Sequence, residues 1–238
     1  MPYRKIVFGT NEIYHILNRG VAQAPIFLSF KEYSRFLNLT DFYRYANSKI
    51  CFSHYEQQPK EMKEKILETI RKNNPLLVEI YAYCLMPNHF HLLLKQLKEN
   101  GISVMLSNLQ NGYAKYFNLR YQRQGPLFQS MFKAVRIETD DQFLHVSRYI
   151  HLNPSTSYLV KTEELLSYKW SSFSEYLGER PAIFTNKKQI IDLIGGKRKY
   201  KEFVFDQVKY QQELEKIKHL SLEKPQVSIY PTPGVGRK

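Results

Sequence analysis

Residues 78–95 read VEIYAYCLMPNHFHLLLK and predict two strands joined by a tight turn. In residues 78–86 apolar side chains alternate with their neighbours, the period of a strand in a sheet. The apolar positions are Val78, Ile80, Ala82, Cys84 and Met86. Pro87 and Asn88 predict a turn, and residues 89–95 predict a second, very apolar strand. The two strands are therefore expected to pair as an antiparallel hairpin.

The second strand of this hairpin carries two histidines two residues apart. His89 and His91 should point to one face of the sheet, and Phe90 to the other. Two neighbouring imidazoles can share a divalent metal ion. The same spacing also fits two polar residues on a solvent-facing strand, so the pair alone does not decide between these interpretations.

A helix predicted over residues 140–153 carries a second polar pair. Asp140 and Asp141 favour its start, and Pro154 should end it, since the residue before a proline disfavours helical geometry. Tyr149 and Asn153 are four residues apart and share a helix face. A phenol can act as a nucleophile, and an amide carbonyl can complete a metal site. Helical tyrosines more often pack, however, and Asn-Pro more often ends a helix.

The remaining pattern predicts one antiparallel sheet covered by helices, an α+β fold. A strand is expected over residues 11–18, with Ile13, His15 and Leu17 on one face. A further strand is expected over residues 127–137. Helical periodicity covers residues 33–46, 60–72, 103–121, 170–177 and 187–220.

The charge of the chain favours a polyanionic partner. Lys and Arg number 35 against 22 Asp and Glu, which gives a net charge of +13. The 18 Tyr and 15 Phe suit stacking of nucleic-acid bases, although many such rings also serve a core. A solvated basic surface is the alternative interpretation of the charge.

The sequence also limits the location of the chain. No apolar run approaches the length of about 18 residues that spans a bilayer, so a soluble protein without a membrane partner is expected. The two cysteines, Cys51 and Cys84, lie far apart and lack zinc-finger spacing. Neither a disulfide framework nor a thiolate zinc site is indicated, and a reducing cytoplasm is expected.

Four motifs in a fixed order resemble a known family. Residues 14–20 (YHILNRG), 86–93 (MPNHFHLL), 125–129 (GPLFQ) and 148–154 (RYIHLNP) are similar to the single-tyrosine HUH transposases, which are IS200-like. The most similar branch is that of the REP-associated tyrosine transposases. Together the four motifs are far more specific than the histidine pair or the tyrosine helix alone.

The resemblance implies a ferredoxin-like antiparallel sheet, the HUH endonuclease fold, with His89 and His91 as metal ligands. It implies Tyr149 as the nucleophile, and it places Asn153 where the family has a metal-coordinating Gln or Asn. The implied cofactor is Mg²⁺ or Mn²⁺, and the implied substrate is single-stranded or hairpin DNA, cut and rejoined through a 5′-phosphotyrosine. A domesticated protein that binds a DNA hairpin without mobilising it is the alternative, and an unrelated metal-binding protein is a third.

The resemblance implies a catalytic domain over residues 1–160, and the helical pattern that follows predicts an extension over residues 161–220. Residues 221–238 contain proline and glycine and lack a periodic apolar face, so a disordered tail is expected there. The chain could act as a monomer or a homodimer, and the extension favours the monomer. Five arginines are candidates for holding DNA phosphates, although each could equally be a solvated surface charge. They are Arg19, Arg120, Arg123, Arg136 and Arg148.

Overall fold

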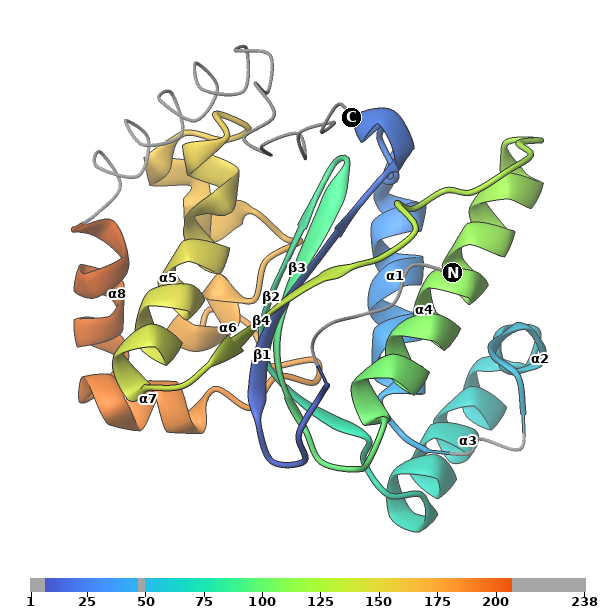
Figure 1. Cartoon of the computed structure of the whole chain (residues 1–238), viewed down its shortest axis with the longest axis horizontal. Helices are drawn as coiled ribbons and strands as arrows, with labels where there is room; N and C mark the ends of the chain where they lie inside the picture. Colours follow the sequence, from blue (N-terminus) through green and yellow to red (C-terminus); the bar gives the residue numbers. More distant parts are fainter. Residues whose placement is uncertain (1–6, 47–49, 207–238) are drawn as a thin grey trace, which may run out of the picture.

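The computed structural model describes residues 7–46 and 50–206 and has one four-stranded sheet within them (Figure 1). All of its neighbouring strands are antiparallel, and their order is β2-β3-β1-β4. The strands are β1 (Ile13–Arg19), β2 (Val78–Met86), β3 (His89–Gln96) and β4 (Lys133–Ile137). Three α-helices and a 3-10 helix, η1 (Val21–Gln23), lie between β1 and β2 in the chain, and one helix connects β3 to β4, so the predicted α+β, ferredoxin-like arrangement is confirmed.

The first face of the sheet packs against α1 (Phe30–Tyr43) and α4 (Gly101–Arg120). Phe36 of α1 contacts Phe90 of β3, with ring centroids 4.8 Å apart, and Tyr113 of α4 lies beside Phe36. Two further helices, α2 (Phe52–Glu56) and α3 (Lys60–Asn73), lie on the same side. This face is therefore filled by an apolar core.

The second face is covered by elements that follow β4 in the chain (Figure 1). They are α5 (Asp140–Thr156), the 3-10 helix η2 (Thr162–Ser167), α6 (Phe173–Leu177), α7 (Lys188–Ile194) and α8 (Lys197–Phe205). Isolated backbone bridges join Cys84 to Ser171 and Ile80 to Thr185. Residues 161–206 therefore form part of the layer that contains α5, and they add to a second core that includes Phe143, Ile150 and Tyr200.

Strand β2 departs from the expected alternation. Its register against β3 shifts between Ile80 and Ala82, where Tyr81 is inserted as a bulge. Ile80 consequently packs in the core of the first face, and Ala82 packs in the core of the second. The periodicity could not indicate this change, because both faces of β2 are covered and nearly every position is apolar.

Three further expectations about elements are wrong. Helix α5 does not end before Pro154 but continues to Thr156, because the N–H of Ser157 still donates to the carbonyl of Asn153 at 3.0 Å. The strand predicted over residues 127–137 pairs continuously only over β4. Phe128 forms an isolated bridge with Gly20, and the chain between Phe128 and Lys133 is too long to follow β1 in register.

The helix predicted over residues 187–220 is divided into α7 and α8. Gly195 and Gly196 separate them with positive φ angles of 80° and 120°, a conformation that ends a helix. The rest of that prediction, beyond residue 206, and the predicted tail over residues 221–238 lie outside the described residues.

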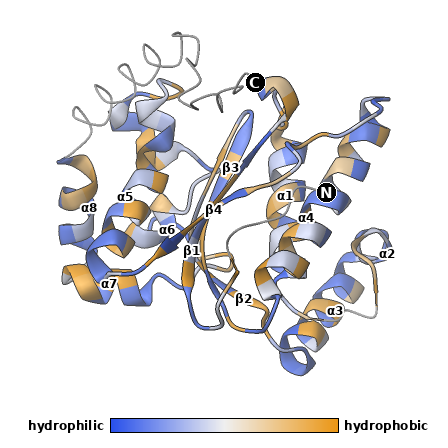
Figure 2. Ribbon diagram, in the orientation of Figure 1, coloured by the Kyte–Doolittle hydropathy of each residue, from blue (hydrophilic) through white to orange (hydrophobic). Residues whose placement is uncertain are grey.

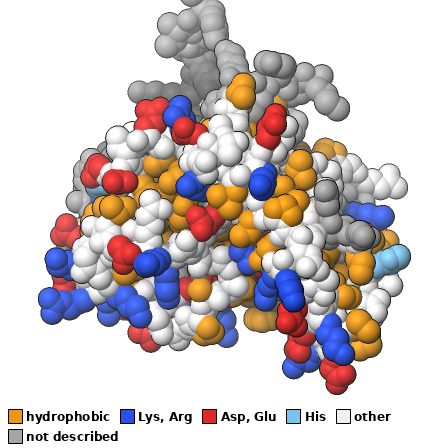
Figure 3. All heavy atoms as spheres, turned by 90° about the horizontal axis from the view of Figure 1, so that it is seen from below, with side chains coloured by type: hydrophobic (Ala, Val, Ile, Leu, Met, Phe, Trp, Pro, Cys, Tyr) orange, Lys and Arg blue, Asp and Glu red, His pale blue; other side chains and the backbone are white. Residues whose placement is uncertain are grey.

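Hydropathy and charge follow the layers. Figure 2 shows hydrophobic residues concentrated along the strands and on parts of the helices that pack against them. Seen from below in Figure 3, Lys and Arg are interspersed with Asp and Glu, so that end presents no uniformly basic surface. No helix within residues 7–46 and 50–206 combines the length and apolar character needed to cross a membrane.

Candidate metal and nucleophile site

Strands β1 and β3 bring three histidines to the second face of the sheet. His91 lies opposite Leu17, and His89 lies opposite Arg19. His15 is two residues from Leu17 on β1, so it lies diagonally across from His91, within reach of a ring side chain. The apolar neighbours of the two β3 histidines, including Phe90, face the opposite core as predicted.

The two nitrogens of His91 have different environments. The Nδ1 atom lies 2.9 Å from Nε2 of His15. The Nε2 atom is buried and has no hydrogen-bond partner among the described residues. Unpaired buried polar atoms are rare and cost about 1–3 kcal/mol. If Nδ1 carries the proton and donates it to His15, Nε2 presents a lone pair, the state that a metal ligand requires.

His89 is held in a similar way. Its Nδ1 atom lies 2.6 Å from Oδ1 of Asn88, which leaves Nε2 outside this hydrogen bond. Burial, together with the charge of Arg19, lowers the pKa of His89 to about 4. Burial also lowers the pKa of His91 well below its ordinary value. Both imidazoles are therefore neutral near pH 7 and able to bind a cation.

Helix α5 places Tyr149 and Asn153 against this pair of histidines. Thr139 caps the helix by accepting the N–H of Gln142 at 3.1 Å. The Tyr149 ring lies edge-on to His91, with centroids 5.6 Å apart. Asn153 donates Nδ2 to the carbonyl of Tyr149 at 2.8 Å, so its amide oxygen takes no part in this bond. The predicted shared face of Tyr149 and Asn153 is therefore observed.

The histidines, the tyrosine and the asparagine line one cavity of about 540 Å³. Arg19 lies in the same wall, and none of the lining residues within the described chain is Asp or Glu. The lining residues are Leu17, Arg19, Gln23, Pro25, Met86, Pro87, Asn88, His89, His91, Tyr149, Asn153, Ser157 and Leu159. Such a lining suits an anionic ligand.

The donors in this cavity fit a divalent metal ion. They are the Nε2 atoms of His89 and His91 and the amide oxygen of Asn153, and a mixture of imidazole and oxygen donors suits Mn²⁺ or Mg²⁺. No cluster of three or more His, Cys, Asp and Glu side chains suited to a metal occurs in residues 7–46 and 50–206. A metal here would therefore use two imidazoles and complete its shell with oxygen donors.

Only one of the five candidate arginines lies at the cavity. Arg120 pairs with buried Glu32 at 3.0 Å, and Arg136 pairs with Glu12 at 2.7 Å. Arg123 donates to Asn118 at 3.0 Å. These three are exposed to different degrees on other parts of the surface, whereas Arg19 lines the cavity.

Arg148 faces away from the cavity, although it precedes Tyr149. Its guanidinium lies 4.0 Å from the ring centroid of Phe203 and donates to the carbonyl of that residue at 3.2 Å. A second nitrogen contacts His145 Nδ1 at 2.6 Å. Only 5% of Arg148 is exposed. It therefore attaches α5 to α8, and its position does not favour contact with DNA phosphates.

His15 was not singled out from the sequence. Its place on the same strand face as Leu17 was predicted, but the strand order that puts β1 beside β3 could not be read from the period. His15 is largely buried, and burial lowers its pKa to about 4. Its ring also lies 5.9 Å from that of Tyr149.

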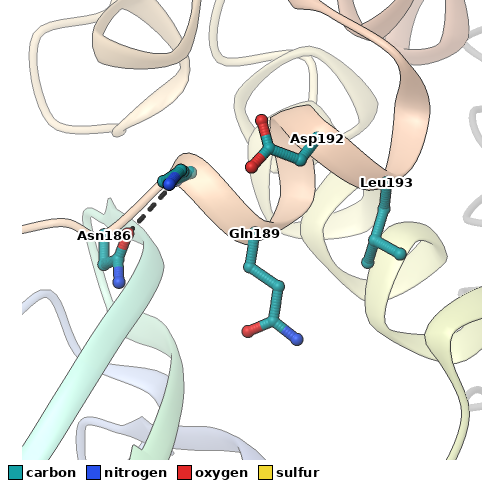
Figure 4. Close-up of a pocket in the computed structure, with 5 residues that line it drawn as sticks. Asn186, Gln189, Asp192 and Leu193 are labelled. Carbon is teal, nitrogen blue, oxygen red and sulfur yellow. Dashed lines mark hydrogen bonds between the residues drawn. The ribbon is translucent and has the colours of Figure 1, made fainter.

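A second depression lacks the groups needed for chemistry. It lies on α7 and is lined by Asn186, Lys188, Gln189, Asp192 and Leu193 (Figure 4). Asn186 accepts the backbone N–H of Lys188 at 3.2 Å, and the other side chains point in different directions. No histidine or cysteine is among its lining residues in the described chain.

Comparison with known proteins agrees with the motifs. Residues 49–153 match the model of a family described as "Transposase IS200 like". The match covers less than half of the 238 residues, and it includes both β3 histidines, Tyr149 and Asn153 but not β1. The resemblance predicted from the sequence is confirmed over this stretch. A search of curated proteins found no match.

One similar solved structure is that of a REP-associated tyrosine transposase bound to a REP hairpin. It covers 80% of this chain and 93% of its own, with 14% sequence identity and a TM-score of 0.50. At this identity the likeness concerns the fold, and it agrees with an α+β HUH arrangement.

Proposed function

We propose that this chain cuts and rejoins single-stranded DNA beside a hairpin through a covalent bond to Tyr149. The observation that carries the proposal is the unpaired, buried Nε2 of His91 in a cavity that also contains the Tyr149 ring. The match of residues 49–153 to IS200-like transposases supports the same chemistry.

The metal site would consist of His89, His91 and Asn153. A bound Mg²⁺ or Mn²⁺ ion supplies a positive charge that polarises the scissile phosphate. His15 and Asn88 keep the two imidazoles oriented through their Nδ1 atoms. Arg19 adds a fixed positive charge to the same wall for the phosphate backbone.

The proposed reaction exchanges one phosphate ester for another. The phenol oxygen of Tyr149 attacks the phosphorus and loses its proton, and the bond from phosphorus to the 3′ oxygen breaks. The 3′ oxygen gains a proton and leaves as a hydroxyl, while the 5′ phosphate stays on the tyrosine. Attack by another 3′-OH reverses these steps, so rejoining requires no ATP.

A cleavage assay tests the proposal. A labelled hairpin with single-stranded flanks and Mn²⁺ should give a free 3′-OH end with the wild-type protein. His91→Ala should lower the rate by more than about 100-fold, since a ligand should matter more than the partners that orient it. His54→Ala, which changes an exposed histidine on α2, should leave the rate unchanged.

The outcomes separate the two functions that the family resemblance leaves open. Hairpin binding with no cleavage by wild-type protein in Mn²⁺ or Mg²⁺ would contradict the enzyme and favour a domesticated hairpin-binding protein. Cleavage that is equally fast in His91→Ala would contradict the assignment of the metal site.

A further inference from the structure

A different depression from the one on α7 lies next to the proposed catalytic cavity, and half of its lining residues are aromatic. Its volume is about 370 Å³. The lining residues are Ser29, Phe30, Tyr33, Val160, Ser167, Tyr168, Lys169 and Trp170. None of the chemistry proposed for Tyr149 uses them.

The rings form a stack that runs from the core to the surface. Phe27, which is buried, lies parallel to Tyr33 with centroids 4.6 Å apart. Tyr33 lies parallel to Trp170 at 4.5 Å, and Phe30 meets Trp170 at 5.0 Å with an interplanar angle of 64°. Phe30 is 65% exposed. The stack therefore ends in an aromatic side chain that is open to a ligand.

The backbone around the stack is fixed to the sheet. The Tyr168 hydroxyl donates to the carbonyl of Leu85 at 2.6 Å. The N–H of Leu85 donates to the carbonyl of Trp170 at 2.8 Å. Ser29 caps α1, where Phe30 is the first residue. An ordered aromatic surface of this kind loses little conformational entropy when a flat ligand stacks on it.

Residues that are adjacent in the chain line the depression and the catalytic cavity. Leu159 lines the cavity, and Val160, the next residue, lines the depression. On the other side, Leu85 is hydrogen-bonded to Tyr168 and Trp170, and the next residue, Met86, lines the cavity. The depression therefore lies next to the cavity in which a phosphate beside Tyr149 would be bound.

The charge of the depression also suits DNA. Lys169 lines it, and exposed Lys31 follows Phe30 in the chain. No Asp or Glu occurs among its lining residues in the described part of the chain. Proteins usually bind single-stranded DNA with cationic side chains that contact the phosphates and aromatic side chains that stack on the bases.

We propose that Phe30 and Trp170 form a stacking site for an unpaired base of the DNA strand next to the scissile phosphate. This inference rests on the proposed function, because it takes single-stranded DNA as the ligand. It assigns a specific role to residues outside the metal site, namely holding the flank of the substrate.

Trp170 is the single tryptophan of the chain, so its fluorescence reports directly on this site. The wild-type protein is titrated in EDTA with a short oligothymidylate and, separately, with an abasic strand of equal length. We expect the base-bearing strand to quench the fluorescence and the abasic strand, which carries the same phosphates, to leave it nearly unchanged. Phe30→Ala should weaken binding of the oligothymidylate about ten-fold, the scale of one lost base stack.

Leu119→Ala is the matched control, since it removes an exposed apolar side chain from α4 and should leave binding unchanged. Equal quenching by the abasic strand, strand binding without quenching, or unchanged affinity in Phe30→Ala would each overturn the stacking site. Cleavage by wild-type protein without quenching would refute the stacking site alone. Quenching without cleavage would refute the proposed reaction alone.

Discussion

The two ring nitrogens of His91 have different environments. Its Nδ1 atom meets His15, and its Nε2 atom is left for the cavity. Ligand imidazoles are commonly oriented by a partner on the other ring nitrogen, and that partner is usually a carboxylate or a carbonyl. Here it is a second neutral imidazole, which provides an acceptor without adding a charge.

His15 should therefore strengthen metal binding without touching the metal. We expect His15→Leu to weaken Mn²⁺ binding about 10–100-fold, because His91 loses the acceptor that fixes its tautomer. His15→Gln retains an acceptor and should restore part of the affinity. Calorimetry with Mn²⁺ in the absence of DNA measures this, and equal affinities in wild type and His15→Leu would contradict the role.

At this scale the sequence indicated which pairs of polar residues share a face, and the structure brings both pairs to one cavity. His89 and His91 could be placed together because strands have a period of two, and Tyr149 and Asn153 because helices repeat every 3.6 residues. Arg148 lies apart from Tyr149 for the same physical reason, since adjacent residues on a helix point in different directions. The roles of these residues in catalysis stay predictions.

Helix α5 connects the site to the rest of the second layer. One side carries Tyr149 and Asn153, and the other carries Arg148, which packs on Phe203 of α8. His151, on the same helix, is hydrogen-bonded through both of its ring nitrogens. Its Nδ1 is 2.8 Å from the Tyr200 hydroxyl, and its Nε2 is 2.7 Å from Ser172 Oγ. The position of the nucleophile thus depends on residues beyond 160.

His151 predicts how the stability depends on pH. Burial lowers its pKa from 6.5 to about 3, so the folded protein holds it neutral while the unfolded chain binds a proton below about pH 6.5. The contribution of the neutral His151 to the free energy of unfolding is complete above pH 6.5. It is lost as the pH falls towards 3, by up to about 1.4 kcal/mol per pH unit.

Urea unfolding of wild type and His151→Gln at several pH values measures this pH dependence of the stability. The variant should be less stable at pH 8, where it loses well-formed hydrogen bonds, yet its free energy of unfolding should fall less steeply between about pH 6 and pH 4. Parallel curves for the two proteins would show that His151 does not titrate in this way.

The elements that the sequence missed share a physical cause. The bulge at Tyr81 and the loop between Phe128 and Lys133 are changes of register, which depend on partners elsewhere in the chain. The extension of α5 past Pro154 depends on a buried environment that offsets a weak local preference. The break at Gly195-Gly196, in contrast, is a local signal in the sequence. It was missed because the charge-rich helical pattern continues on both sides of the two glycines.

At the scale of the molecule, the helices of the ferredoxin-like unit cover one face of the sheet, and the elements after β4 cover the other. The site lies where the second layer meets β1 and β3. The net charge of +13 and the order of the four motifs indicated a DNA-processing protein of this fold from the sequence. The cover of the second face by residues 161–206 could not be predicted, because those short helices have weak periodicity.

The two adjoining cavities predict a preference for unpaired DNA. Hairpins with single-stranded flanks should bind more tightly than blunt duplexes of equal length, because a duplex keeps its bases away from Phe30 and Trp170. Affinity for both should fall steeply with salt, as counterion release requires. Gel shifts at several salt concentrations measure this. Equal binding of the two DNAs would contradict a single-strand site.

Covalent attachment of Tyr149 to DNA distinguishes the proposed reaction from hairpin binding alone, and mapping the attached residue measures it. A labelled hairpin with single-stranded flanks is incubated with the protein and Mn²⁺, denatured, digested and analysed by mass spectrometry. We predict a 5′-phosphotyrosine adduct on Tyr149 that is absent in Tyr149→Phe, which loses only a hydroxyl and should still fold and bind the hairpin. Tyr158→Phe, which changes an exposed tyrosine just beyond α5, should form the adduct at the wild-type level. An adduct on another tyrosine, or one that persists in Tyr149→Phe, would show that Tyr149 is not the nucleophile.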